Sequence, residues 1–157
     1  MKTYILNGFM YPLDKYFPNS DKVKNIWRWN WNKKKAIEFA DTIKGPCQLI
    51  GFSDGATAAL EVANNSIYVQ RVYCHSCMYR SHEMLRRFEV VFFRTNGDTT
   101  PTYDGTEKRF LSYKVAGYPC EIMDLDPVTI SNKNIVDRIS GLFGHQFENA
   151  MPYIKIT

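Results

Sequence analysis

Short apolar runs alternate along the chain with longer segments whose apolar residues recur at helical spacing. Short runs rich in β-branched and aromatic side chains predict strands. They cover residues 3–7, 25–30, 47–51, 67–73, 89–94 and 120–125. Apolar residues spaced three or four positions apart predict helices between and after these runs. The expected helices cover residues 33–43, 56–63, 81–88, 103–113 and 134–143.

This alternation determines the expected fold class. Strands separated by helices are typical of a parallel sheet with helices on both faces. The chain of 157 residues is long enough for one core and contains no repeat, low-complexity tract or linker. We therefore expect a single α/β domain over residues 1–157, a three-layer α/β/α sandwich with a mostly parallel sheet of about six strands.

The composition narrows the class of protein further. Hydrophobic residues make up 45% of the chain and charged residues 23%, values that argue against disorder, collagen and coiled coil. No run reaches the roughly 18 apolar residues of a membrane span. The first residues contain no sustained apolar stretch of the kind that a secretory signal needs. These features predict a cytoplasmic protein without a membrane span.

The charge pattern does not by itself indicate a partner. The formal net charge is +4, and the basic residues are scattered except for Lys33, Lys34 and Lys35, which fit a solvated helix start. Trp27 and Trp31 belong to an alternating Trp segment that would suit base stacking, but such a segment also fits a half-buried strand or a pocket wall. We expect no nucleic-acid partner.

The four cysteines do not form a disulfide scaffold in a chain of this size. Cys74 and Cys77 enclose His75 in a pattern similar to half of a zinc site, but no second pair at similar spacing exists. Cys47 and Cys120 each open an apolar run and are expected to be small buried side chains. We expect neither a metal nor a cofactor.

One segment carries a strong chemical signal. Residues 51–55 read G-x-S-x-G, with Ser53 at the centre, where a predicted strand must turn sharply into a predicted helix. Gly51 and Gly55 are small enough to let strand and helix approach each other on either side of the serine. Such a turn lifts the Ser53 hydroxyl above the sheet and directs the Asp54 N–H into the same space.

At this segment the chain resembles the α/β-hydrolase family, and the resemblance extends over nearly the whole sequence. It implies a minimal, lidless member, because only residues 74–88 stand where larger relatives insert a lid. The family carries its triad in the order nucleophile, acid, histidine. Asp98, in a Gly-Asp loop after the second strand beyond Ser53, is the implied acid; Asp104, Asp124 and Asp126 are the reserves.

The resemblance also implies a base and an oxyanion hole. His145, in a Gly-His segment after the last predicted strand, matches the family's histidine, although a predicted helix intervenes. His75, at the active-site edge, is the alternative base or a pocket residue. The oxyanion donors would be the backbone N–H groups of Asp54 and of Phe9, in the loop after the first strand.

The implied function is that of a serine esterase or lipase-like carboxylic-ester hydrolase acting through an acyl-enzyme intermediate. A lidless cleft suits a small-molecule ester, a thioester or an acylated substrate. Met10, Tyr11, Phe52 and His75 are the expected substrate-binding residues. The alternative is a catalytically degenerate α/β-hydrolase that acts as a small-molecule or protein binding module.

Overall fold

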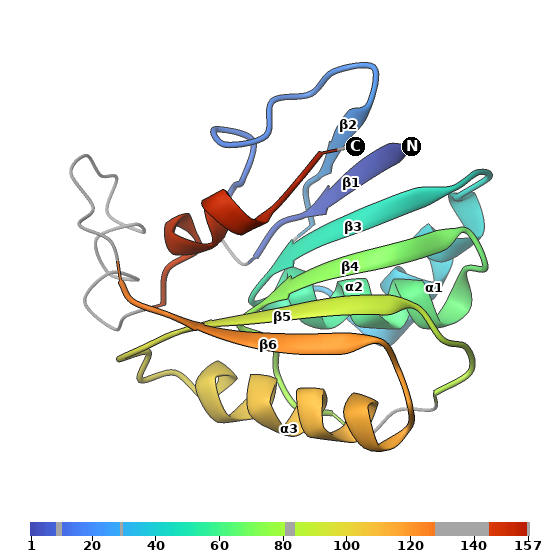
Figure 1. Ribbon diagram of the computed structural model, residues 1–157. Helices are drawn as coiled ribbons and strands as arrows, with labels where there is room; N and C mark the ends of the chain where they lie inside the picture. Colours follow the sequence, from blue (N-terminus) through green and yellow to red (C-terminus); the bar gives the residue numbers. More distant parts are fainter. Residues whose placement is uncertain (9–10, 29, 81–83, 128–144, 157) are drawn as a thin grey trace.

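A six-stranded sheet forms the centre of the computed structural model (Figure 1), which describes residues 1–8, 11–28, 30–80, 84–127 and 145–156. The strand order is β2-β1-β3-β4-β5-β6, and every neighbouring pair is parallel. The strands are β1 (Lys2–Leu6), β2 (Val23–Ile26), β3 (Cys47–Phe52), β4 (Val69–His75), β5 (Glu89–Thr95) and β6 (Cys120–Leu125). The expected α/β class and parallel six-stranded sheet are confirmed.

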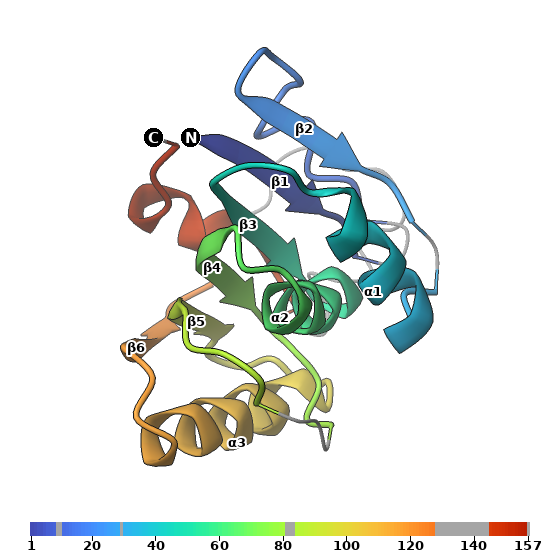
Figure 2. The same ribbon diagram turned by 90° about the vertical axis from the view of Figure 1, so that its right-hand side faces the viewer.

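The three α-helices lie on one face of this sheet (Figure 2). They are α1 (Lys33–Thr42), α2 (Asp54–Asn65) and α3 (Thr102–Val115). Among the described residues, the other face is covered by residues 11–17 and by the 3-10 helix η1 (Glu148–Tyr153). The helix predicted at residues 134–143 lies outside the described residues.

Alternation along the strands separates two apolar cores. Leu49 and Val72 face the α-helices, whereas Ile50 and Tyr73, their neighbours in sequence, face the opposite side. The helix-side core is closed by small residues of α2, such as Ala59, which let this helix lie close to the sheet. No helix in the described part of the chain is long and apolar enough to cross a membrane.

The strand predicted at residues 25–30 is placed differently in the structure. β2 spans Val23–Ile26 and ends where its partner β1 ends, with Leu6 opposite Ile26. The Ile26 carbonyl then accepts a hydrogen bond of 3.1 Å from the Asn7 side chain. A side chain thus takes the place of the next backbone hydrogen bond between the two strands, and Trp27 and Trp31 lie outside the sheet.

The helix predicted at residues 81–88 is wrong over its described part, residues 84–88, which are not helical. This segment is held by side chains instead. The Leu85 N–H donates to Asn64 Oδ1 at 2.7 Å, and the Arg86 guanidinium donates to the Ala63 carbonyl at 2.8 Å. Bonds to the end of α2 replace the internal bonds of a helix. The other helices predicted before residue 134 are confirmed, with ends shifted by a few residues.

Candidate active site

The candidate residues follow the carboxyl ends of neighbouring strands. Because the sheet is parallel, all these ends meet at one edge (Figure 1). Ser53 directly follows β3, His75 ends β4, and Asp98 follows β5 after a short turn. His145 lies further along the chain, beyond β6. The parallel topology explains how residues far apart in sequence reach the same edge.

Ser53 occupies a strained turn between β3 and α2. Its φ of 58° and ψ of −119° fall in a region that residues with a Cβ rarely adopt. The turn is held on both sides, because the Ser53 N–H donates to the His75 carbonyl at 2.9 Å and its own carbonyl accepts from the Ala56 N–H at 3.0 Å. The strand and the helix together impose this conformation on Ser53.

The two glycines of the G-x-S-x-G segment are required by close backbone contacts. A Cβ at Gly55 would lie 2.1 Å from the Leu6 carbonyl oxygen. A Cβ at Gly51 would lie 2.6 Å from the Gly55 carbonyl oxygen and 2.7 Å from the Ala56 Cα. The approach of strand and helix predicted from the sequence is therefore present, and no larger residue fits without displacing backbone.

The structure brings Asp98 and His145 together. The imidazole Nδ1 of His145 lies 3.0 Å from Asp98 Oδ2. The Asp98 side chain is fully buried, and that of His145 is 13% exposed. The imidazole also packs against Phe52, with ring centroids 4.7 Å apart. Since Phe52 directly precedes Ser53, this contact places the histidine beside the serine turn.

Two threonines complete the surroundings of the Asp98 carboxylate. The Thr100 N–H donates to Oδ1 at 2.8 Å, and the Thr102 hydroxyl donates to Oδ2 at 3.1 Å. Burial raises the pKa of Asp98, but the bonds from His145 and Thr100 outweigh burial, so the net shift is downward. The carboxylate is therefore held in its charged form.

The reserve acids have other surroundings. Asp124 forms an ion pair with Arg94 across β5 and β6, and Asp126 accepts a hydrogen bond of 3.0 Å from Asn96. Asp104 is exposed in the first turn of α3. Of the four candidate carboxylates, Asp98 is the one that contacts His145 among the described residues.

The loop after β1 approaches the serine turn closely. A Cβ at Gly8 would lie 2.8 Å from the Phe52 carbonyl oxygen and 3.3 Å from the Ser53 Cβ. Asn7 holds this loop in place, because its Oδ1 accepts from the Leu13 N–H at 2.6 Å. Phe9 and Met10, predicted as an oxyanion donor and a substrate contact, lie outside the described residues.

Asp54 begins α2, so its N–H directly follows Ser53 in the turn. Its side chain is used elsewhere, because Oδ2 accepts from the Trp31 N–H at 2.8 Å and Oδ1 lies 4.0 Å from an Arg80 nitrogen. Burial raises the pKa of Asp54, and the Trp31 and Arg80 contacts offset part of this shift. The side chain thus links the start of α2 to the segment before α1.

His75 is completely buried beneath the edge and does not contact Asp98 in the described hydrogen bonds. Its Nε2 lies 3.2 Å from Asn149 Oδ1, and its Nδ1 lies 2.8 Å from the Ser76 hydroxyl. Burial lowers the pKa of His75 to about 3, more than the Asn149 bond raises it. Both ring nitrogens therefore have structural partners, and the ring is neutral at physiological pH.

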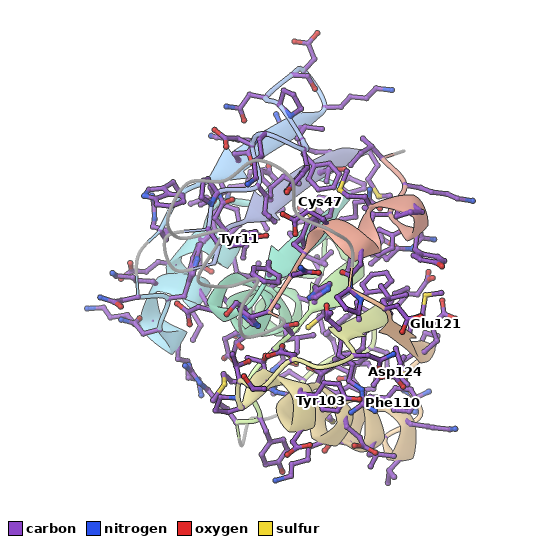
Figure 3. All side chains as sticks on the ribbon, turned by 90° about the vertical axis from the view of Figure 1, so that its left-hand side faces the viewer. Tyr11, Cys47, Tyr103, Phe110, Glu121 and Asp124 are labelled. Atoms are coloured by element: carbon purple, nitrogen blue, oxygen red, sulfur yellow. The ribbon has the colours of Figure 1, made fainter. Side chains whose placement is uncertain are left out.

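Tyr11 and Phe52 are packed in the core rather than on an open surface; Figure 3 shows Tyr11 among closely packed side chains. Tyr11 is 2% exposed and Phe52 is not exposed, and their ring centroids lie 4.6 Å apart. The Tyr11 hydroxyl donates to the Glu148 carboxylate at 2.9 Å. Neither side chain presents surface to a substrate in this arrangement.

The Cys-x-x-Cys segment lies inside the helix-side core. Cys74 and Cys77 are fully buried, and the Cys77 N–H donates to the Thr106 hydroxyl at 3.0 Å. Burial raises the pKa of the Cys74 thiol. Over the residues that the structure describes, no group of three or more His, Cys, Asp or Glu is placed to hold a metal ion.

Several residues around the site were not identified from the sequence. Thr100 and Thr102 follow Asp98 closely, and the Thr100 N–H and the Thr102 hydroxyl could have been recognised as partners for a buried carboxylate. Asn149 gave no such signal. It reaches His75 from η1, and its Nδ2 also donates to the Thr95 hydroxyl at 2.7 Å.

Comparison with solved structures gives the same fold. Esterase PE8 superimposes with a TM-score of 0.58 at 13% identity, covering 92% of each chain. SOBER1 of Arabidopsis thaliana gives 0.58 at 12% identity over 91% of this chain and 97% of its own. A carboxylesterase from Mesorhizobium loti gives 0.56 at 12% identity over 90% and 88%.

At the level of sequence, no protein-family model matches the chain, and no curated protein matches it. The structural likeness, together with the parallel sheet and the serine turn, shows an α/β-hydrolase fold. The predicted fold is confirmed.

Proposed function

We propose that the protein is a serine carboxylic-ester hydrolase with Ser53 as nucleophile, His145 as base and Asp98 as the orienting acid. The observation that carries this proposal is the 3.0 Å contact between His145 Nδ1 and the buried Asp98 carboxylate, beside the strained Ser53 turn. A serine on such a turn, with a histidine oriented by a carboxylate, is the arrangement that activates a hydroxyl for acyl transfer.

The chemistry then follows from the positions of the groups. With Nδ1 donating to Asp98, the other imidazole nitrogen, Nε2, accepts the Ser53 proton as the hydroxyl attacks the ester carbonyl. The Asp98 carboxylate stabilises the imidazolium that forms. His145 returns the proton to the departing alcohol, which leaves an acyl group on Ser53. Water then attacks this acyl-enzyme by the same route and releases the acid.

The oxyanion of each tetrahedral intermediate would be stabilised by the N–H groups of Asp54 and Phe9. The Asp54 N–H starts α2, where the helix dipole adds positive potential. The close approach of Gly8 to Ser53 supports the assignment of the second donor to the loop that follows Gly8. One such donor is typically worth about 3 kcal/mol of transition-state stabilisation.

The neighbours in structure support the reaction class. They include an esterase and carboxylesterases, and we extend ester hydrolysis to this chain as part of the proposal. The substrate would be a small ester, thioester or acylated molecule. Because Tyr11, Phe52 and His75 are buried, we infer that they support the site and that other residues contact the substrate directly.

The proposal is tested by steady-state hydrolysis of 4-nitrophenyl esters of increasing acyl length. The wild type should turn over the short esters, and Ser53→Ala should lose about four orders of magnitude or more in kcat. A matched control is Ser66→Ala, which changes a serine at the far end of α2. Turnover retained in Ser53→Ala would exclude the mechanism. An inactive, folded wild type that still binds an ester analogue would instead indicate the binding module.

A further inference from the structure

A small cavity lies on the helix side of the serine turn. It has a volume of about 60 Å³, more than one water molecule needs, and opens between α1, α2 and the segment after β4. Thr57, one turn after Ser53 on α2, forms part of its wall. Trp31, which precedes α1, forms another part. The cavity is therefore separate from the Asp98–His145 pair but close to the same turn.

The charged side chains in the described wall of this cavity are mainly cationic. Lys33 from α1, Arg80 from the segment after β4 and Arg109 from α3 line it, together with the carboxylate of Glu61. These three cations come from three different parts of the chain, so only the fold brings them together. Cations that converge on a small cavity favour an anion within it.

Arg109 is the most firmly positioned of the three cations. It is only 2% exposed, and its Nε donates to the Met78 carbonyl at 3.0 Å. Gly105 lets α3 approach the same segment, because a Cβ there would lie 2.7 Å from the Cys77 carbonyl oxygen. A guanidinium held in this way loses little freedom when it binds a ligand, which favours affinity.

The start of α1 adds to the positive potential. Lys33 is the first residue of this ten-residue helix, and the Asn32 side chain caps it by accepting from the Lys35 N–H at 2.8 Å. Backbone N–H groups and the helix dipole both favour negative charge at this end. The second independent contribution comes from the buried Arg109 side chain, which belongs to another helix.

Two carboxylates limit what the cavity can hold. Glu61 lines the wall, and Asp54 lies 4.0 Å from an Arg80 nitrogen. Because 4.0 Å is long for an ion pair, and because a guanidinium has five N–H donors, the Asp54 contact is compatible with a ligand on Arg80. Among the residues that the structure describes, the three cations outnumber these two carboxylates.

We propose that this cavity is a binding site for a small oxyanion group, a phosphate or a carboxylate, held by Lys33, Arg80 and Arg109. Planar guanidinium groups match both anions, and the ammonium of Lys33 supplies a further charge at the entrance. The anion is either free in solution or a substituent of the ester substrate. The site is defined by charge and shape alone, so binding does not depend on the proposed hydrolysis.

The direct test is isothermal titration calorimetry of the wild type with inorganic phosphate, at an ionic strength kept constant with potassium chloride. We expect saturable binding of one phosphate per chain. Lys33→Gln should weaken it about fivefold and Arg80→Gln about tenfold. Lys34→Gln removes the same charge one position away, outside the cavity wall, and should leave binding within about twofold.

The proposal is overturned if titration with phosphate gives no saturable heat. It is also overturned if Lys33→Gln and Lys34→Gln weaken phosphate binding equally, because an equal effect would indicate only the general positive charge of this surface. Arg80→Gln provides a second variant at an exposed side chain, so that a folding defect in one variant does not decide the result. Circular dichroism of each variant checks the fold before titration.

A competition experiment distinguishes the two sources of the anion. Monomethyl succinate carries both an ester and a carboxylate, whereas butyrate carries only the carboxylate. If the anion belongs to the substrate, monomethyl succinate displaces phosphate from Ser53→Ala at a concentration about tenfold lower than butyrate does. If the two compounds displace phosphate equally, the site takes a free anion. Both readouts measure binding, so a failure of the hydrolase proposal would not affect them.

Discussion

The Nδ1 atom of the His145 imidazole lies 3.0 Å from Oδ2 of Asp98, whose side chain has no solvent exposure. A buried carboxylate is unfavourable unless its oxygens are well bonded. Here His145, Thr100 and Thr102 provide these bonds, and those from His145 and Thr100 hold the pKa of Asp98 below its usual value despite its burial. The charge on Asp98 is thus available to orient and stabilise a protonated imidazole.

Replacing this charge tests the role of the pair. Asp98→Asn keeps the size of the side chain but cannot stabilise an imidazolium, so kcat for a short ester should fall about 10⁴-fold. The change in KM should be small, because Asp98 does not contact substrate in the proposed mechanism. Asp104→Asn, at an exposed carboxylate on α3, is the control and should remain within about twofold of wild type. If kcat of Asp98→Asn falls by less than about tenfold, Asp98 is not the orienting acid of the proposed mechanism.

The strained backbone at Ser53 predicts a gain in stability when the serine is replaced by glycine. With φ at 58° and ψ at −119°, a Cβ is unfavourable here, and glycine relieves the strain. Ser53→Gly should raise the free energy of unfolding by about 1 kcal/mol, measured in urea. Ser53→Ala removes the same hydroxyl but keeps the Cβ, so it should stay near wild type. Equal stability of the two variants would contradict the strain.

The contact between the helix start and β1 predicts a strong effect at Gly55. Because an added Cβ would lie 2.1 Å from the Leu6 carbonyl oxygen, Gly55→Ala should lower the free energy of unfolding by about 3 kcal/mol. Gly45→Ala makes the same chemical change where nothing lies within 4 Å of the added Cβ. Urea denaturation of both variants should show a near-neutral effect at Gly45. A comparable, small effect at Gly55 would be inconsistent with the observed packing.

The buried His75 predicts a dependence of stability on pH. Burial lowers its pKa to about 3 from a value of 6.5, so the unfolded chain takes up the proton first as the pH falls. The free energy of unfolding should therefore decrease as the pH falls below 6.5, by up to about 1.4 kcal/mol per pH unit from His75. Above pH 6.5, His75 should contribute no dependence of stability on pH. His75→Gln should flatten the curve between pH 6.5 and about 5. Parallel curves for variant and wild type would show that His75 does not cause the slope.

Local sequence spacing was sufficient to predict the serine turn. The pattern at residues 51–55 requires small residues two positions on either side of Ser53, and the structure shows the contacts that impose this requirement. The position of Asp98 after β5 also follows from the order of the strands. In both cases the determining interactions are close in sequence or fixed by the parallel topology.

Other features depended on contacts that the sequence does not reveal. The Asn7 side chain ends β2 at Ile26, although the apolar pattern continues beyond it. Hydrogen bonds to the Asn64 side chain and the Ala63 carbonyl of α2 hold residues 84–88, which are not helical. Tyr11 and Phe52 were expected to line the substrate site, but the C-terminal segment covers them, with Phe147 packed against Phe52 at 5.8 Å between ring centroids.

The central claim is that Ser53 is a nucleophile activated by His145, and its most direct test is labelling with a fluorophosphonate probe. Wild type, Ser53→Ala and His145→Ala are treated in parallel, and the modified peptide is mapped by mass spectrometry. The account predicts stoichiometric labelling of the wild type at Ser53, no labelling of Ser53→Ala, and labelling of His145→Ala slowed by several orders of magnitude. Labelling of the wild type at another residue, or none in a folded sample, would contradict it.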